Sequence, residues 1–248
     1  MKLLRTLLSR RWLLATVVVL AAISVMLRLG VWQLDRLAQR RAANEALRVS
    51  LAANVLVLPG ADIPADVASV QDRRVTAVGA FDLTAQVILK VQDWQGQPGV
   101  HLLTPLLLGD GETAVLVDRG WIPESDADHA TLPAYDEPGV VTVDGVAALP
   151  QVITRGGTAV QPTAPQTEWY RVDVAAIQNQ LPYTLLPFYI IQAPSPGGDV
   201  SLPYRAIPEV DLSEGSHLSY AVQWLLFSLI LGGGYVYYVI KDGRTPTT

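Results

Sequence analysis

The residues that could bind a metal or catalyse a reaction are few in this chain of 248 residues. It has no cysteine, two methionines and three histidines, His101, His129 and His217. Thiol catalysis, disulfides and thiolate metal sites are therefore excluded, and the cluster of soft sulfur or imidazole ligands that a copper carrier needs cannot be formed. A single axial ligand to a haem requires only one imidazole, so haem binding stays open.

His217 stands at the start of an uncharged apolar run that continues to residue 240. If this run is a helix with about 100° per residue, small, polar or aromatic side chains form a face beneath His217. The members of this face lie within about 40° of it: Ala221, Trp224, Ser228 and Tyr235. Tyr220 flanks the same side. The face fits either helix–helix packing with an interfacial histidine or an apolar crevice that offers one imidazole to a haem.

Three residues near the end of an earlier apolar run share a helical face. Arg28, Trp32 and Arg36 recur at i, i+4 and i+8. Two cations on either side of an indole could hold the propionates of a haem. They could equally anchor a helix at lipid headgroups.

One close group of hard ligands could hold a cation. It consists of Glu124, Asp126, Asp128 and His129. The alternative is an acidic, solvated loop after Pro123. His101 falls in an expected strand, where a packed side chain is the simpler interpretation. No nucleophile elbow, phosphate-binding loop, dinucleotide fingerprint or zinc-protease motif is present.

Two apolar runs are expected to position these residues. Residues 12–27 carry no charge, and with the next five residues they reach the roughly 20 residues that span a bilayer. We expect one transmembrane helix over 12–32 and a second over 217–240. A cleavable signal peptide is the alternative for the first, but no small-x-small cleavage site closely follows the run.

The basic residues predict the orientation of the two spans. Lys2, Arg5, Arg10 and Arg11 precede the first span, and Lys241 and Arg244 follow the second. The positive-inside rule then places residues 1–11 and 241–248 in the cytoplasm and residues 33–216 outside it, in a two-pass protein of the cell membrane. Nucleic-acid binding is not expected, because the middle part is acidic.

The middle part, 33–216, is expected to be mainly antiparallel β (α+β), closed into a barrel or packed as a sandwich. Residues 35–50 should continue the first helix beyond the membrane, and 174–181 should form a short helix. A hairpin is expected at Gly109-Asp110-Gly111 and a loop over 194–208. The expected strands are 74–81, 87–91, 102–108, 114–118, 140–149, 170–174 and 188–192. After the strand over 114–118, Trp121 should be a core or interface aromatic, and Gly120 should permit close backbone approach.

Four separated motifs resemble the Surfeit locus protein family of cytochrome c oxidase assembly factors. The first is LGVWQLDR at 29–36, the second is PG at 98–99 followed by TPL at 104–106, and the third is VLVDRGWIP at 115–123. The fourth is HLSYAVQW at 217–224. Their order and the two-span layout match the family over nearly the whole chain. Asp118 stands where the family usually has asparagine, Leu225 where phenylalanine is common, and Arg40 or Arg41 where lysine is usual.

The resemblance implies a role in building haem-copper oxidase by holding or delivering haem a for the catalytic subunit. That subunit is the implied partner, haem a synthase is a second candidate, and no enzymatic activity is expected. The family's haem-ligating histidine falls on His217. In the expected arrangement haem a lies between the two helices, with Trp32 and Trp224 as walls and Arg28 or Arg36 at the propionates. The full set of expected cofactor-binding residues is Arg28, Trp32, Arg36, His217, Tyr220 and Trp224.

Two other functions remain open from the sequence. The first is a scaffold that grips an oxidase subunit and binds no haem. The second is a membrane-tethered hydrolase with an acidic β domain, against which the missing catalytic motifs speak.

Overall fold

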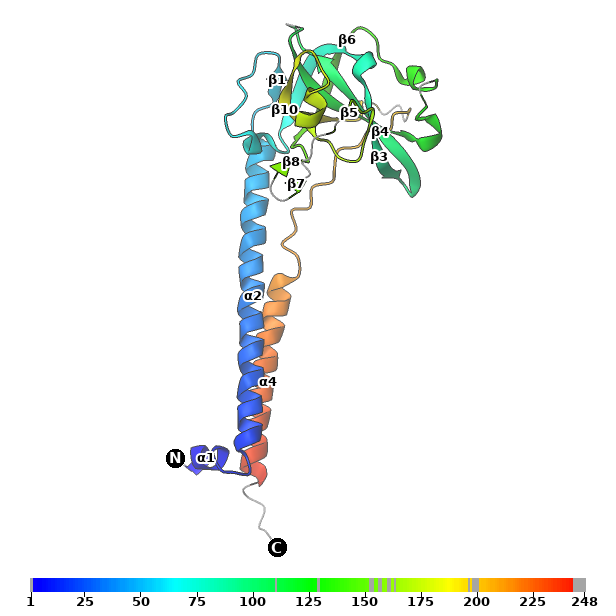
Figure 1. Cartoon of the computed structure of the whole chain (residues 1–248). Coiled ribbons are helices and arrows are strands. Elements are labelled where there is room, and N and C mark those ends of the chain that lie inside the picture. The colour runs from blue at the N-terminus through cyan, green and yellow to red at the C-terminus, as the bar shows by residue number, and fades with distance from the viewer. Residues whose placement is uncertain are drawn as a thin grey trace. The chain divides into compact units, whose positions relative to one another are not determined.

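The computed structural model describes residues 2–109, 111–128, 130–151, 154–155, 158–159, 162, 164–195, 197 and 201–242. The chain divides into two compact units. The helical unit comprises Met1–Ala46 and Asp211–Thr248, and the sheet unit comprises Leu47–Val210. Figure 1 shows the elements of both units, each of which is described by itself below.

The helical unit is built from α1 (Lys2–Leu7), α2 (Leu13–Ala52) and α4 (His217–Asp242). α2 and α4 are both long and apolar enough to cross a membrane, by length and composition. The expected first span and its continuation form one helix of 40 residues, which ends at Ala52, seven residues before Pro59. Its sequence favours this, because leucine, alanine, arginine and glutamine are strong helix formers and proline is absent.

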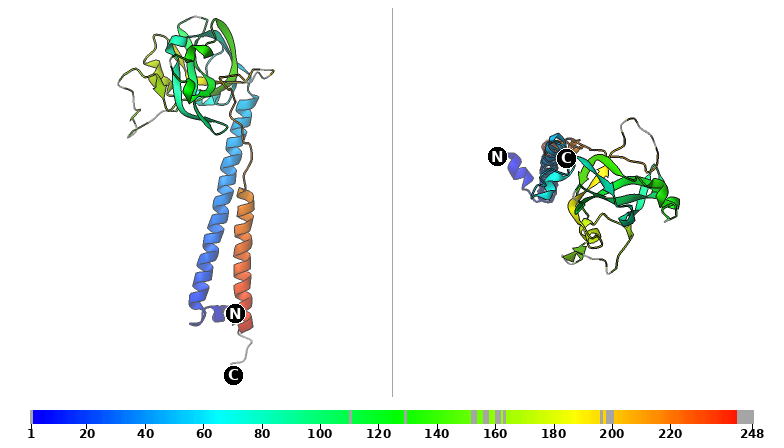
Figure 2. Two further views of the ribbon diagram at one scale, coloured as in Figure 1. Left: turned by 90° about the vertical axis from the view of Figure 1, so that its right-hand side faces the viewer. Right: turned by 90° about the horizontal axis from the view of Figure 1, so that it is seen from above.

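α2 and α4 lie side by side and run antiparallel (Figures 1 and 2). The buried positions of α2 recur at multiples of seven residues, namely Thr16, Gly30, Leu37 and Asn44. On α4, Ala221 and Ser228 are buried with the same spacing. A repeat of seven is the pattern of two helices that pack at a shallow left-handed crossing. This confirms that Ala221 and Ser228 lie on a packed face of α4.

The sheet unit contains one sheet of eight strands and a separate two-stranded pair, β7 (Thr154–Arg155) with β8 (Thr158–Ala159). The strands of the large sheet are β1 (Leu56–Leu58), β2 (Arg74–Phe81), β3 (Val87–Trp94), β4 (Gln97–Leu107), β5 (Thr113–Pro123), β6 (Val140–Ala148), β9 (Glu168–Trp169) and β10 (Thr184–Gln192). The helical segments are α3 (Val174–Gln178) and four 3-10 turns, η1 (Val67–Val70), η2 (Leu83–Ala85), η3 (Glu124–Asp126) and η4 (Leu132–Tyr135).

The order of the large sheet is β1-β2-β6-β10-β5-β4-β3-β9. β2 also pairs with β4, at Ala80–Leu107 and Phe81–Leu106, so the pairing runs from β2 through β6, β10, β5 and β4 back to β2. The sheet is mixed: five of its pairings are antiparallel, which agrees with the expected mainly antiparallel sheet, and three are parallel, which was not expected. β10 runs parallel to β5, β1 to β2, and β3 to β9.

The core of the sheet unit lies on both sides of β5. Every residue of β5 from Ala114 to Ile122 is buried, as expected for a strand that is covered on both faces. Phe188 and Val117 belong to one buried cluster, whereas Leu116 and Trp169 belong to another. β5 is therefore the rigid centre of the unit, and the third sequence motif occupies it.

Several predicted elements differ from the structure. The strand expected over 170–174 is wrong, because only Glu168–Trp169 pair and the carboxylate of Asp173 then accepts from the Ala176 amide and begins α3. α3 ends at Gln178 rather than at residue 181. The hairpin at 109–111 is confirmed between β4 and β5, where the Leu108 amide donates to Thr113 O at 2.9 Å; Asp110 lies outside the described residues. Within the described part of 194–208 there is no helix or strand, as expected.

Candidate site at the His217 end of the helix pair

His217 is the first residue of α4, and it faces α2 at Gln33. His217 Nδ1 lies 2.9 Å from Gln33 Oε1. With the amide oxygen as acceptor, Nδ1 carries the proton and donates, and Nε2 retains its lone pair. The contact therefore orients the imidazole and leaves one nitrogen able to ligate a metal.

Gly215 lies beside the other edge of the imidazole. Its φ is +67°, and a Cβ built on it would lie 3.6 Å from His217 Cδ2 and 3.7 Å from Nε2. A side chain here would stand beside the nitrogen that carries the lone pair. Glycine thus both permits the turn before α4 and leaves space next to Nε2.

Further along the pair, Gly30 allows the two helices to approach closely. A Cβ built on it would lie 3.7 Å from both Ala221 O and Trp224 Cβ. Trp224 is half-buried and packs edge-on against Phe227, with 6.1 Å between ring centroids. A small residue at such a contact is typical of helix pairs in membranes.

The other expected cofactor-binding residues do not join this contact. Arg28 and Trp32 lie two positions on either side of Gly30, which is roughly half a turn around the helix from the side that meets α4. Trp32 is 43% exposed, and the Arg36 guanidinium lies 5.6 Å from the centroid of its ring. Tyr220 is 48% exposed on α4. Among the described residues, the structure thus brings His217 and Trp224 to α2, whereas Trp32 lies on a more exposed face of α2.

A set of contacts that sequence reasoning missed holds the segment just before α4. Arg41 binds both carboxylate oxygens of Glu214 at 2.8 Å, and Arg40 contacts Asp211 at 2.9 Å. Asn44 Nδ2 donates to the carbonyl oxygen of residue 212 at 2.7 Å. We call these contacts the clasp. Hydrogen bonding to Glu214 raises the pKa of Arg41, and hydrogen bonds from Ser213 and the charge of Arg40 hold the pKa of Asp211 below its usual range.

The clasp could have been inferred from the charges in the sequence. Arg40 and Arg41 follow the first apolar run, and Asp211 and Glu214 precede the second. An antiparallel pair of helices brings these opposite charges to the same end of the pair. Bidentate arginine–carboxylate pairs have defined geometry. The clasp therefore restricts where 211–216 can lie and, through it, the position of His217.

In the sheet unit, the third motif forms a β-bulge opposite β4. The register shifts between His101 and Leu103, so that β5 carries an extra residue at Arg119-Gly120. Asp118 accepts from the Gly120 amide at 3.0 Å and lies 2.8 Å from His101 Nδ1. His101 is half-buried in β4, as expected for a packed side chain, and has a carboxylate partner.

The bulge also explains Gly120 and Trp121. Gly120 has a φ of +113°, and a Cβ there would lie 2.5 Å from Tyr204 O. Trp121 is 1% exposed and stacks on Tyr204 with centroids 5.8 Å apart. The backbones of Trp121 and Tyr204 exchange hydrogen bonds of 2.9 and 2.8 Å. The predictions of a core aromatic and of close backbone approach are both confirmed.

The acidic loop after Pro123 does not gather into a metal site in the described part of the chain. There, no three histidine, aspartate or glutamate side chains are placed to share an ion. Asp126 accepts from Tyr135 and Ser125, and these bonds lower its pKa; burial and this contact raise the pKa of Tyr135 to about 12. His129 lies outside the described residues. The solvated-loop interpretation fits these contacts.

Comparison with known proteins relates both units to one family. The sequence profile of the SURF1 family matches residues 20–229. The chain belongs to the SURF1 family. This confirms the family to which the four motifs pointed.

Individual SURF1-like proteins match along most of their length. One from Monosiga brevicollis is 27% identical over 233 residues, which cover 87% of this chain and 84% of the relative. An uncharacterised SURF1-like protein of Mycobacterium bovis is 30% identical over 243 residues, or 94% and 85% of the two chains. One from Rickettsia felis is 25% identical over 232 residues, or 89% and 95%. The SURF1 match includes Gln33, the whole sheet unit and His217.

Proposed function

We propose that this SURF1 protein is a non-enzymatic assembly factor for cytochrome c oxidase, and that it holds or delivers haem a for the catalytic subunit. Membership of the family, across both helices and the sheet unit, supports the role in oxidase assembly. The geometry of His217 supports the haem part. Gln33 orients the ring, and Nε2 lies on the side of Gly215, which has no side chain.

The residues at this end fit a haem that is bound as cargo. His217 Nε2 would ligate the iron, and Gln33 would hold the tautomer that keeps Nε2 unprotonated. Trp224 and Tyr220 would supply an aromatic flank. Arg36, stacked against Trp32, is a candidate for a propionate. Arg28 lies on the far side of α2 from α4 and suits the lipid headgroups better.

We also propose a two-pass arrangement in the cell membrane, with both termini in the cytoplasm and the sheet unit outside. The two long apolar helices and the basic residues at both chain ends support it. In this arrangement His217 lies where α4 enters the outer leaflet. Haem propionates could then reach water while the ring lies in an apolar setting.

A scaffold that binds no haem is the second candidate, and the contact at Gly30 favours it. The helices already touch there, so a haem would have to lie beside the pair rather than between its members. A visible absorption spectrum separates the two functions. Protein purified from a host that makes haem a should carry haem, and His217→Ala should lose it at normal protein level.

His101→Ala is the matched control, because it removes an imidazole from the sheet unit and should leave the haem in place. If wild-type protein never carries haem, or if His217→Ala carries as much haem as the wild type, the haem role is wrong and the scaffold role takes its place.

A further inference from the structure

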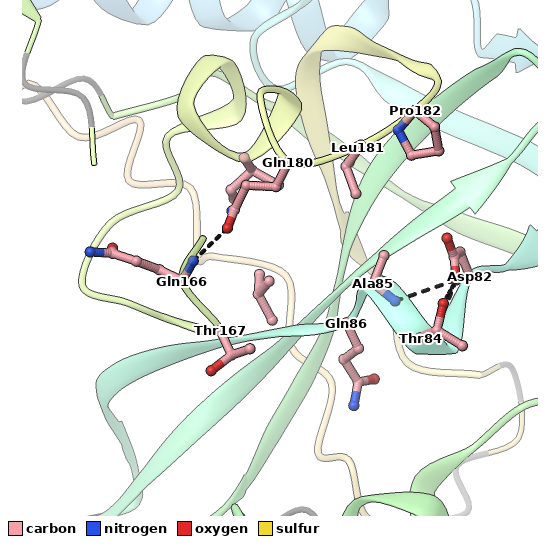
Figure 3. A pocket seen from close by; sticks show the side chains of 11 residues that line it. Asp82, Thr84, Ala85, Gln86, Gln166, Thr167, Gln180, Leu181 and Pro182 are labelled. Atoms are coloured by element: carbon pink, nitrogen blue, oxygen red, sulfur yellow. Dashed lines mark hydrogen bonds between the residues drawn. The ribbon is translucent and has the colours of Figure 1, made fainter. Parts of the chain in front are cut away.

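Three hollows on the sheet unit share wall residues and form one elongated groove. The central hollow has a volume of about 360 Å³, and Figure 3 shows its lining. It shares Thr84, Gln86 and Thr167 with a hollow of about 180 Å³. It shares Gln180 with a third, of about 170 Å³. A glutamine therefore stands at each junction, Gln86 at one and Gln180 at the other.

The carboxamide of Gln86 has a defined orientation. Its Oε1 accepts from Thr104 Oγ1 at 2.8 Å and from Arg119 Nη1 at 2.9 Å, and both Thr104 and Arg119 are fully buried. A guanidinium has donors only, so the atom that faces it must be the amide oxygen. Gln86 therefore directs its NH₂ group away from this network, at the wall that two hollows share.

The carboxamide of Gln180 is also oriented by a hydrogen bond to its oxygen. Its Oε1 accepts from the Gln166 backbone amide (dashed in Figure 3), which can only donate. Among the described residues, neither Gln86 Nε2 nor Gln180 Nε2 donates to a protein acceptor. The groove thus has a fixed pair of amide donors, one at each junction of its hollows.

The charges around the groove disfavour an anionic occupant. Asp82 lines the central hollow, and Asp136 lines the hollow of about 180 Å³. Asp82 stays ionised, since hydrogen bonds from Thr84 and Tyr183 lower its pKa even though burial opposes this. The sheet unit has 18 acidic residues and 8 basic ones. The groove therefore suits a ligand that accepts hydrogen bonds and is uncharged or basic.

We propose that this groove binds an extended, uncharged or basic peptide segment of a partner protein, whose carbonyl oxygens accept from Gln86 and Gln180. An extended chain presents carbonyl groups every few ångströms along its length, as a row of hollows with spaced donors requires. Leu181 and Pro182 line the central hollow, are not buried, and offer apolar contacts to peptide side chains. Peptide binding goes beyond the proposed function and does not depend on haem.

The test uses the full-length protein in detergent with three octapeptides blocked at both ends, one neutral, one with two lysines and one with two glutamates. The neutral and basic peptides should bind at least tenfold more tightly than the acidic one. Gln86→Glu and Gln180→Glu keep the oxygen acceptor and replace the NH₂ donor by a second acceptor. Each should weaken the neutral peptide about tenfold, the effect of losing one good hydrogen bond.

Gln97→Glu is the matched control, because it adds the same charge at an exposed position of β4 outside the three hollows. It should leave the affinity unchanged. The proposal would be overturned by no peptide bound at millimolar concentration, by equal affinity for wild type and Gln86→Glu, or by equal weakening by Gln97→Glu. A blocked dipeptide that binds as well as the octapeptide would restrict the site to a small amide and overturn the extended-chain occupant.

Discussion

Gly120→Ala should strongly destabilise the sheet unit, because two penalties coincide there. The φ of +113° is unfavourable for any residue with a Cβ, at about 1–3 kcal/mol. The new Cβ would also lie 2.5 Å from Tyr204 O, a backbone atom that moves only with its segment. That movement would break two backbone hydrogen bonds and the stack of Tyr204 on Trp121, each worth about 1 kcal/mol.

The combined loss is about 4–6 kcal/mol, which is a large part of the 5–15 kcal/mol that typically stabilises a domain. For a unit of this size, the melting temperature should fall by about 10–20 °C. Tryptophan fluorescence during thermal unfolding is a suitable measurement, because Trp121 and Trp169 are both buried in the unit.

Gly96→Ala is the control that separates the cost of a positive φ from the cost of the steric clash with Tyr204. Gly96 also has a positive φ, +82°, but no atom lies within 4 Å of a Cβ built there. It should cost about 1 kcal/mol and lower the melting temperature by only about 2–4 °C. Equal shifts for Gly96→Ala and Gly120→Ala would refute the reasoning, since the contact with Tyr204 would then contribute nothing.

Three further predictions concern topology, the haem site and pH. A reporter that is active only outside the cytoplasm should be active near Pro64 or Pro194 and inactive at the C-terminus; C-terminal activity would disprove the two-pass arrangement. Gly215→Ala should reduce haem content in the absorption spectrum, because its Cβ would lie 3.7 Å from His217 Nε2, where the haem would have to approach, whereas Gly233→Ala, with no neighbour within 4 Å, should not. The folded-state pKa of Asp82 is lowered, so its contribution to stability is present above the unfolded pKa of about 3.9 and is lost as pH falls below it. The difference in unfolding free energy between wild type and Asp82→Asn should therefore shrink in acid, and a constant difference from pH 7 to pH 3 would contradict this.

The alternation of apolar and polar residues correctly predicted the position of most strands. It did not predict the full length of strands that contain a proline or an irregularity in their pairing. β2 spans 74–81 as expected. β10 was expected to begin at Phe188, after Pro187, yet it begins at Thr184, because the pairing with β5 shifts between Leu185 and Tyr189 and accommodates the proline. β3 likewise continues beyond Val91, whose φ is +60°, through a second irregularity. Side-chain alternation does not specify whether neighbouring strands are parallel, so the mixed sheet could not be predicted from it.

For the candidate site, the sequence predicted which residues could take part, but it did not predict which of them are in contact. The position of His217 followed from the boundary of an apolar run. Its partner Gln33 did not, because a contact between residues 184 positions apart depends on which face of α2 meets α4. The i, i+4 spacing correctly placed Arg28 and Trp32 on one face, but the heptad of buried residues puts a different face against α4. Reading that heptad together with Ala221 and Ser228 would have identified the packed face.

The heptad pairing of α2 and α4 has a consequence for how deep the imidazole of His217 lies. A seam that repeats every seven residues presents a similar surface after a slide of one repeat, which would move His217 by about 10 Å along α2. Polar contacts that do not repeat select one alignment. Thr16 and Tyr235 join their hydroxyl groups at 2.6 Å near one end, and Asn44 binds the carbonyl oxygen of residue 212 near the other. The depth of His217 along the pair is therefore specified by hydrogen bonds on both sides of it, one at Leu212 just before α4 and one at Tyr235 near the other end of α4.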